Sequence, residues 1–396
     1  MRGRGAEREM VIPLSYNLRN MRVRAFSTVM TTLSIGLVVA VFIGVMALAR
    51  GLEEAFVATG MPLNLVVLRQ GSQVETSSVV TRDSLQVIKY LPGVAVDSER
   101  TPLVSPEVIV LLNLSKRSDG QGSNVMVRGV FEKGFELRPQ VRLVAGRLFR
   151  PGLREIIVGR SVAERFQNAG LGETIRFGRS HWRVVGLFEA GRTAFDSEIW
   201  ADASELGEDF DRPNYSSVLI RAEDVSALRA MERRISDDRR LHLKALSEVA
   251  YYAEQTKTAG PIKILGSFMA VMMAIGASFA AMNTMYASVA RRSREIGVLR
   301  VLGFRSGSIM LSFLTESLLL GLAGGVVGCL LALPIHGITT GTTNFRTFSD
   351  VSFAFRITPD LLLRGLAFSL VMGGLGGLLP ARLASRQPMV DTLREG

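Results

Sequence analysis

Four long apolar stretches constrain what this chain can fold into. A helix needs roughly 20 apolar residues to cross a hydrocarbon core about 30 Å thick, and each stretch is long enough. The second would overshoot the bilayer, so we expect it to project on one side. The sequence therefore predicts an α-helical membrane protein with four transmembrane helices, at residues 28–49, 262–290, 309–336 and 361–381.

The ends of the first and fourth stretches carry further signals. A cleaved signal peptide is the alternative for the first stretch, because a basic segment precedes it and Ala-Leu-Ala ends it at 47–49. Its apolar run of about 20 residues exceeds a signal-peptide core, which favours an uncleaved membrane helix. Before the fourth stretch, Thr358, Pro359 and Asp360 predict a helix start with a Thr cap.

The distribution of charge predicts the orientation of these helices. Residues 1–25 and 288–308 each carry a net charge of +4, and residues 382–396 carry +1. Residues 51–260 contain 28 basic and 28 acidic side chains. The positive-inside rule places both termini and residues 288–308 in the cytoplasm, and residues 51–260 with the short 337–360 loop outside. The net charge of +11 is then an orientation signal of a multi-pass inner-membrane protein, and a nucleic-acid partner is not expected.

Residues 51–260 predict an α+β extracytoplasmic domain with two lobes, between transmembrane helices 1 and 2. Short β-type runs alternate with helix-type runs, which turn signals separate. Ser161 and Glu164 have capping-box spacing, and Asp224 is a candidate helix cap. Strands are expected at 64–69, 107–114, 124–130, 155–159, 173–188 (a hairpin) and 241–246; helices are expected at 81–94, 161–172, 225–238 and 247–260, the last as a stalk.

No residue pattern in the chain predicts catalysis. His181, His242 and His336 form no metal-binding motif, and the acidic residues are scattered as on a solvated surface. We expect a non-catalytic subunit without a metal or a cofactor of its own. The phosphate-binding motif GxxxxGK[ST] is absent, so any ATP that drives this protein is expected to be bound by a partner chain.

The apolar stretches contain one deep acid and several closely spaced glycines. Glu316 is a proton relay, faces a structural polar partner or extends its carboxylate to the membrane surface. GxxxG spacing predicts close helix contact, because small residues let backbones approach in a bilayer. This contact is either packing within one subunit or an interface between two copies. The glycines are Gly321, Gly324, Gly325 and Gly328 in the third helix, and Gly373 and Gly377 in the fourth.

The loop after the second stretch combines charge with ordered apolar residues. Residues 291–306 read RRSREIGVLRVLGFRS. Topology alone would explain the arginines, but a topology signal needs no apolar residues. A short helix ended by Gly303 would place Val298, Leu299 and Leu302 on one side. We therefore expect a cytoplasmic helix that docks a partner.

The same segment resembles a known protein family. The stretch "RRSREIGVLRVLGFRSGSIMLSFLTES" is similar to the REIGxLRxxGxxxxxI…E signature of the MacB/FtsX-like permeases of ABC transporters. The opening "LSYNLRNMRVRAFSTVMTTLSIGLVVAVFIG" resembles the family's amphipathic first segment and first span. "LVAGRLFRPGLREIIVGRSVAERF" resembles its extracytoplasmic core domain, and "PARLASRQPMVDTLREG" resembles its C-terminal segment.

The resemblance implies an architecture and a function. Two permease chains would form a homodimer on separate ABC ATPase subunits, with a periplasmic adaptor or membrane-fusion protein as an optional partner. ATP hydrolysis would drive motion of the extracytoplasmic domain and export of a substrate; the alternative is mechanotransmission that regulates cell-wall hydrolases without transport. The ATPase-coupling residues that match the motif are Arg294, Glu295, Ile296, Gly297, Leu299, Arg300 and Gly303.

These expectations divide the chain into six segments. They are a cytoplasmic amphipathic segment with transmembrane helix 1 (1–50), the core domain with its stalk (51–260), transmembrane helix 2 (261–290), a cytoplasmic coupling loop (291–308), transmembrane helices 3 and 4 (309–381) and a cytoplasmic tail (382–396).

Overall fold

The computed structural model describes residues 25–256, 259–344 and 346–386. The expected amphipathic segment before residue 25 and the tail from residue 387 lie outside the described residues. The chain divides into two compact units. We call one the helical unit (up to residue 49, 261–337, and from 355 on) and the other the sheet domain (50–260 and 338–354).

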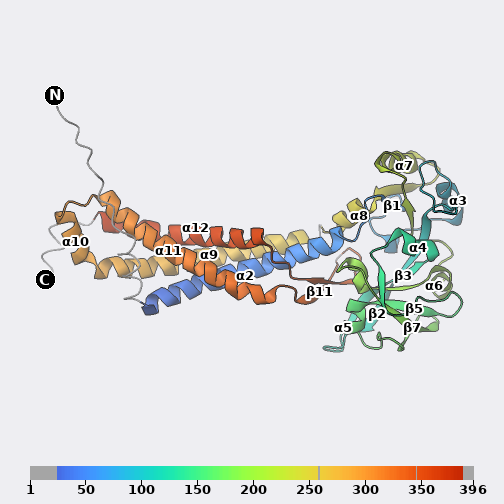
Figure 1. The fold of residues 1–396 in the computed structure, drawn as a ribbon, viewed down its shortest axis with the longest axis horizontal. Helices are drawn as coiled ribbons and strands as arrows, with labels where there is room; N and C mark the ends of the chain where they lie inside the picture. Colours follow the sequence, from blue (N-terminus) through green and yellow to red (C-terminus); the bar gives the residue numbers. More distant parts are fainter. Residues whose placement is uncertain (1–24, 257–258, 345, 387–396) are drawn as a thin grey trace, which may run out of the picture. The chain divides into compact units, whose positions relative to one another are not determined.

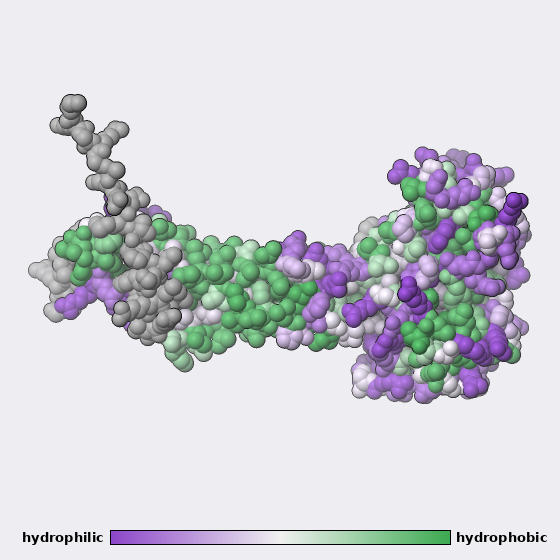
Figure 2. Space-filling view, viewed as in Figure 1, coloured by the Kyte–Doolittle hydropathy of each residue, from purple (hydrophilic) through white to green (hydrophobic). Residues whose placement is uncertain are grey.

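Four helices of the described chain are long and apolar enough to cross a membrane, which makes this a multi-pass membrane protein. Figure 1 shows them running alongside one another, and Figure 2 shows hydrophobic side chains gathered along the middle of the visible face of this bundle. The predicted fold class, four membrane helices with an α+β domain after the first, is confirmed. The helices are α2 (Ala25–Val57), α9 (Ala259–Arg291), α11 (Ser306–Ala332) and α12 (Pro359–Ser385), and the short α10 (Ser293–Val301) joins α9 to α11.

Helix α12 begins as the sequence predicts. The Thr358 hydroxyl accepts a hydrogen bond from the Leu361 backbone N–H, Pro359 occupies the first turn, and Asp360 adds negative charge there. Asp224 likewise caps α7 (Val225–Asp237) by accepting from the Ala227 N–H at 2.7 Å. Both helix starts are therefore encoded by local side chains.

The sheet domain is built on one mixed sheet of ten described strands. Their order is β10-β1-β9-β2-β3-β8-β5-β7-β4, with β6 paired to β7. Most neighbours are antiparallel, and β3 with β8 and β5 with β7 are parallel. The strands are β1 (Asn64–Arg69), β2 (Val104–Ser115), β3 (Gly122–Val130), β4 (Arg142–Gly146), β5 (Glu155–Gly159), β6 (Thr174–Phe177), β7 (Ser180–Glu189), β8 (Glu198–Asp202), β9 (Ser217–Arg221) and β10 (Leu243–Ser247).

Two hydrophobic cores give the sheet domain the two lobes that the sequence predicts. One core joins β1, β9 and β10 to the amphipathic helices α3 and α7, and the other joins β2, β3, β5, β7 and β8 to α5 and α6. Tyr215 packs against both cores. The helices are α3 (Arg82–Lys89), α4 (Glu132–Leu137), α5 (Arg160–Arg165), α6 (Ala203–Asp209) and α8 (Glu248–Gln255), and 3-10 turns cover Glu75–Ser77, Ala194–Ser197 and Leu333–Ile335.

Some local predictions were wrong. The capping box at Ser161 does not form: α5 starts one residue earlier, after Gly159, and has no side-chain cap. It also ends at Arg165 instead of continuing to 172, because Phe166 turns to extended backbone and is buried in the core. Strands β4, β8 and β9 and helix α6 were not predicted, since tertiary pairing decides such short elements.

The linker between α11 and α12 contains an unpredicted β-hairpin. Strands β11 (Thr339–Thr343) and β12 (Asp350–Ala354) pair antiparallel, with Gly341 opposite Ser352. This hairpin belongs to the sheet domain and not to the helical unit. Its second strand is almost completely buried there, unlike a solvent-exposed loop.

Candidate functional site

Helix α10 forms a closed turn between α9 and α11. Gly303, at φ +94°, ends it: the Gly303 N–H donates to the Arg300 carbonyl and the Phe304 N–H donates to the Leu299 carbonyl. These two bonds form a Schellman motif, which needs a residue without a Cβ at this position. The stop at Gly303 was predicted from the sequence.

The two faces of α10 differ sharply in exposure. Ile296 is 2% exposed and packs with α9, α11 and α12 in a core that includes Ile309 and Phe313. Val298 is 47% exposed, and Val301 and Leu302 are each 64% exposed. The buried face of α10 packs against the other helices through Ile296. Its exposed face presents a small apolar surface made of Val298, Val301 and Leu302. We call these three residues the α10 surface.

A buried ion pair fixes the start of α10 to α11. An Arg292 Nη donates to the Glu316 carboxylate at 3.0 Å, and both side chains are 6% exposed. Arg292 also donates to Glu295 at 3.2 Å, and its guanidinium lies 4.9 Å from the centre of the Phe313 ring. Glu316 thus has a structural polar partner, which was one of the alternatives predicted for it. Removing either partner would leave a buried charge uncompensated and would destabilise this connection.

The predicted glycines lie where helices of one chain approach closely. A Cβ on Gly321 would stand 2.7 Å from the Ser369 carbonyl oxygen, and one on Gly373 would stand 2.7 Å from the Ser317 carbonyl oxygen. Gly325 and Gly377 face serine side chains across the same α11–α12 seam. On the other side of α11, Gly324 and Gly328 meet α2 at Ile35, Gly36 and Val39. The six glycines therefore pack within the chain.

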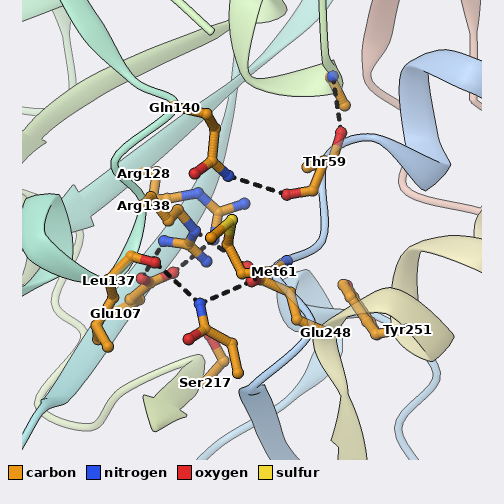
Figure 3. A network of polar contacts seen from close by, with 12 residues as sticks. Thr59, Met61, Glu107, Arg128, Leu137, Arg138, Gln140, Ser217, Glu248 and Tyr251 are labelled. Carbon is orange, nitrogen blue, oxygen red and sulfur yellow. Dashed lines mark hydrogen bonds and ion pairs between the residues drawn. The ribbon is translucent and has the colours of Figure 1, made fainter. Parts of the chain in front are cut away.

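A second constellation, the polar junction, lies inside the sheet domain (Figure 3). Its centre is Arg128 of β3, which donates to Glu198 at 2.8 Å twice, to Glu75 at 3.0 Å and to Glu107 at 2.6 Å. Its guanidinium is buried beside the Phe195 ring, 5.5 Å from the ring centre. We define the polar junction as Glu75, Glu107, Arg128, Arg138, Glu198 and Glu248.

Glu248 of α8 connects the polar junction to the beginning and the end of the domain. Its carboxylate accepts from Arg138 at 3.1 Å, from the Met61 N–H at 3.0 Å and from the Asn64 amide at 2.9 Å. Met61 and Asn64 follow α2, whereas α8 precedes α9. One buried carboxylate therefore holds the segments by which the chain enters and leaves the sheet (Figure 3).

The electrostatics of the polar junction correct the prediction of solvated acids. Glu75, Glu107, Glu198 and Glu248 are all at most 5% exposed. Burial raises the pKa of Glu248 above its ordinary value, and Arg138 opposes this shift. Burial would also raise the pKa of Glu75, but Arg128, Arg138 and the Ser217 hydrogen bond outweigh it and lower that pKa. Four carboxylates around two guanidinium groups are stable only because each has charged or hydrogen-bonding partners.

The described residues hold no cluster of three or more His, Cys, Asp or Glu side chains suited to a metal ion. His181 is an exposed residue of β7 beside the buried Trp182, as an ordinary strand residue would be. The candidate sites of the described chain are the α10 surface and the buried polar junction.

Two family models match the chain. A "MacB-like periplasmic core domain" matches residues 28–238, and an "FtsX-like permease C-terminal" domain matches residues 267–389. The first alone covers more than half of the chain. The chain belongs to the MacB/FtsX-like family of ABC transporter permeases.

Curated relatives of this MacB/FtsX-like permease are described as exporters. The macrolide export ATP-binding/permease protein MacB 1 of Aeromonas hydrophila is 28% identical over 383 residues, which cover 90% of this chain and 56% of that protein. The pyoverdine export ATP-binding/permease protein PvdT of Pseudomonas entomophila is 25% identical over 97% of this chain and 60% of its own length. The chain thus spans less than two thirds of the length of these relatives.

Solved domains of two other proteins are similar to part of the MacB/FtsX-like chain. The extracellular domain of the transporter YknZ from Gram-positive bacteria has a TM-score of 0.35 at 16% identity, covering 46% of this chain and 99% of its own. The periplasmic region of MacB from Actinobacillus actinomycetemcomitans has a TM-score of 0.36 at 12% identity, covering 48% and 91%.

The residues predicted from the permease motif do not all lie on one surface. Ile296 and Gly297 are buried against the bundle, Arg294, Glu295 and Gly303 are exposed, and Leu299 and Arg300 are half-buried. Val301 was not among them, although it is one of the most exposed apolar residues of α10. The apolar residues at i, i+3 and i+4 from Val298 were the signal that could have identified the α10 surface.

Proposed function

We propose that this chain is a permease subunit that couples ATP hydrolysis by a separate ATPase subunit to motion of the sheet domain, and so drives export of a substrate. The observation that carries the proposal is the α10 surface, an apolar patch on a helix that the buried Arg292–Glu316 pair fixes to the bundle. An interface with a protein partner stabilises such a patch, since its exposed side chains leave water on binding. We infer that the partner is the ATPase.

The polar junction supports the second half of the proposal. Because Glu248 holds both the segment after α2 and the segment before α9, displacement of either segment pulls on the central strands through Arg138 and Glu107. Stiff, fully paired charges transmit displacement with little local relaxation. The relatives named as exporters favour export over regulation of cell-wall hydrolases without transport.

We place α10 and both termini in the cytoplasm and the sheet domain outside, with two copies of the chain forming the permease. The charge distribution supports this orientation. In a Cys329→Ser background, Ser118→Cys and Val301→Cys provide exposed thiols in the sheet domain and on α10. A membrane-impermeant maleimide added to intact cells should label position 118 and should label position 301 only after lysis. Labelling of position 301 but not of position 118 in intact cells would show the opposite orientation and contradict the proposal.

Charges on the α10 surface test the proposed partner. We expect Val301→Asp with Leu302→Asp to reduce recovery of the ATPase with the affinity-tagged chain by about 30-fold or more, because two desolvated apolar contacts are worth at least about 2 kcal/mol together. The measurement is quantitative mass spectrometry of the proteins that copurify in detergent.

Val225→Asp is the matched control, since Val225 of α7 is 56% exposed and lies in the sheet domain. It should leave ATPase recovery unchanged. Recovery of no ATPase with the parent chain, or equal recovery with the doubly charged variant, would refute the docking role of α10.

A further inference from the structure

The β11–β12 hairpin is held to the sheet domain by a built polar site. The buried Asp350 carboxylate accepts two hydrogen bonds from Arg165, at 2.6 and 3.1 Å, and one from the Ser123 hydroxyl at 3.2 Å. Lys116 Nζ lies 3.4 Å from the same carboxylate. We define these four residues, Lys116, Ser123, Arg165 and Asp350, as the hairpin anchor.

The backbone of the hairpin fits the same partner. A Cβ on Gly341 of β11 would stand about 2.1 Å from an Arg165 Nη, so the guanidinium lies directly on the glycine. The Ser352 N–H donates to the Ser197 hydroxyl at 2.8 Å. Asp350 and Gly341 lie on different strands, and both engage Arg165. Both strands of the hairpin therefore contact Arg165, and the attachment of the hairpin does not depend on one contact.

The hairpin also reaches the polar junction. The Asn344 amide donates to Gln255 of α8 at 3.1 Å. A cavity of about 20 Å³, room for about one water molecule, is lined by Glu75, Arg128, Glu198, Gln255, Asn344 and Asp350, among others. Residues from the hairpin, the central strands and α8 thus enclose one polar space. Movement of the hairpin changes the surroundings of Arg128.

We propose that the hairpin anchor is a second coupling connection, through which displacement of the α11–α12 linker reaches the sheet domain in addition to the segments after α2 and before α9. This inference rests on the proposed function. Asp350 is a positioning residue: it keeps the α11–α12 linker bound to the sheet domain, so that the sheet domain moves when α11 and α12 move. Without this bond, displacement of the helices reaches the sheet domain only through the segments after α2 and before α9.

Hydrogen exchange of the full-length chain in lipid nanodiscs tests the anchor without any ATPase. In Asp350→Asn, amides of residues 339–354 should exchange on the order of 100-fold faster, because the variant leaves Arg165 and Lys116 without their buried partner. Arg165→Gln should have the same effect, and the double variant should be no worse than either single variant. Amides of β1 and β10 should keep their protection, which shows that the remaining sheet is folded.

Asp119→Asn is the matched control, because Asp119 is an exposed acid of the neighbouring β2–β3 turn. It should leave exchange of residues 339–354 unchanged. Exchange within about twofold of the parent in both Asp350→Asn and Arg165→Gln would overturn the anchor, since loss of a partner of the buried Asp350 carboxylate, or of its charge, has a larger effect.

A second arm tests coupling in the complex with the copurified ATPase. ATP with orthovanadate should change exchange in the sheet domain of the parent, and Asp350→Asn should reduce this change by half or more while the rate of ATP hydrolysis is retained. An undiminished response would overturn the coupling role. If no ATPase copurifies with the parent, the proposed function fails, and the exchange of residues 339–354 still decides the anchor.

Discussion

Replacing Arg128 with methionine should destabilise the sheet domain by about 3–5 kcal/mol, because Glu75, Glu107 and Glu198 would remain buried around a side chain without charge. The two tryptophans of the chain, Trp182 and Trp200, are both buried in this domain, so intrinsic fluorescence reports on it specifically. The unfolding midpoint of the detergent-solubilised chain should fall by about 10 °C, given roughly 2–4 °C per kcal/mol for a domain of this size.

Arg160→Met is the control for Arg128→Met. Arg160 pairs with Glu164 and Glu189 on the surface, where its side chain is 60% exposed. Exposed ion pairs contribute at most about 1 kcal/mol, so this variant should shift the midpoint little. Equal shifts for the two variants would show that burial of the polar junction does not determine its stability contribution.

Replacing Gly373 with valine should separate α11 from α12. Its Cβ would stand 2.7 Å from the Ser317 carbonyl oxygen and 3.0 Å from the Gly321 Cα, and backbone atoms cannot rotate away. We expect a loss of about 3 kcal/mol, the upper end of ordinary overpacking. Titration with SDS, followed by circular dichroism of the helices, should show unfolding at a lower SDS fraction.

Gly374→Val provides a control on the same helix and in the next position. A Cβ there would meet only a Leu318 methyl group at 3.8 Å, an ordinary contact. Its transition should match that of the parent. A similar loss in both variants would mean that valine weakens α12 itself, and that the seam with α11 is not responsible.

The sequence predicted the parts of the fold that single segments encode. Spans of apolar residues, the Thr358 cap and the Gly303 stop depend on nearest neighbours, and the structure contains all three. The polar junction depends on residues far apart: Glu75 contacts Arg128, and Glu107 contacts Arg138. Nothing in the local pattern around these glutamates distinguishes them from solvated acids.

The candidate site was predicted in position but not in detail. A short helix was expected in the loop after α9, and α10 is that helix; its docking role stays a prediction. The motif includes Ile296 and Gly297, which the structure turns toward the bundle, whereas Val301 is exposed. A sequence motif does not distinguish residues that are exposed on the helix from residues that pack the helix against the bundle.

The hairpin also sets an order for biosynthesis. Residues 261–337, with two membrane helices, are translated between the main part of the sheet domain and residues 338–354. Asp350, Ser352 and Phe353 of the hairpin become buried in that domain. The domain therefore lacks this part of its structure until α11 has been synthesised. Until then, the side of the sheet domain that the hairpin covers is incomplete, so the domain can reach its final fold only after α9 and α11 have been synthesised.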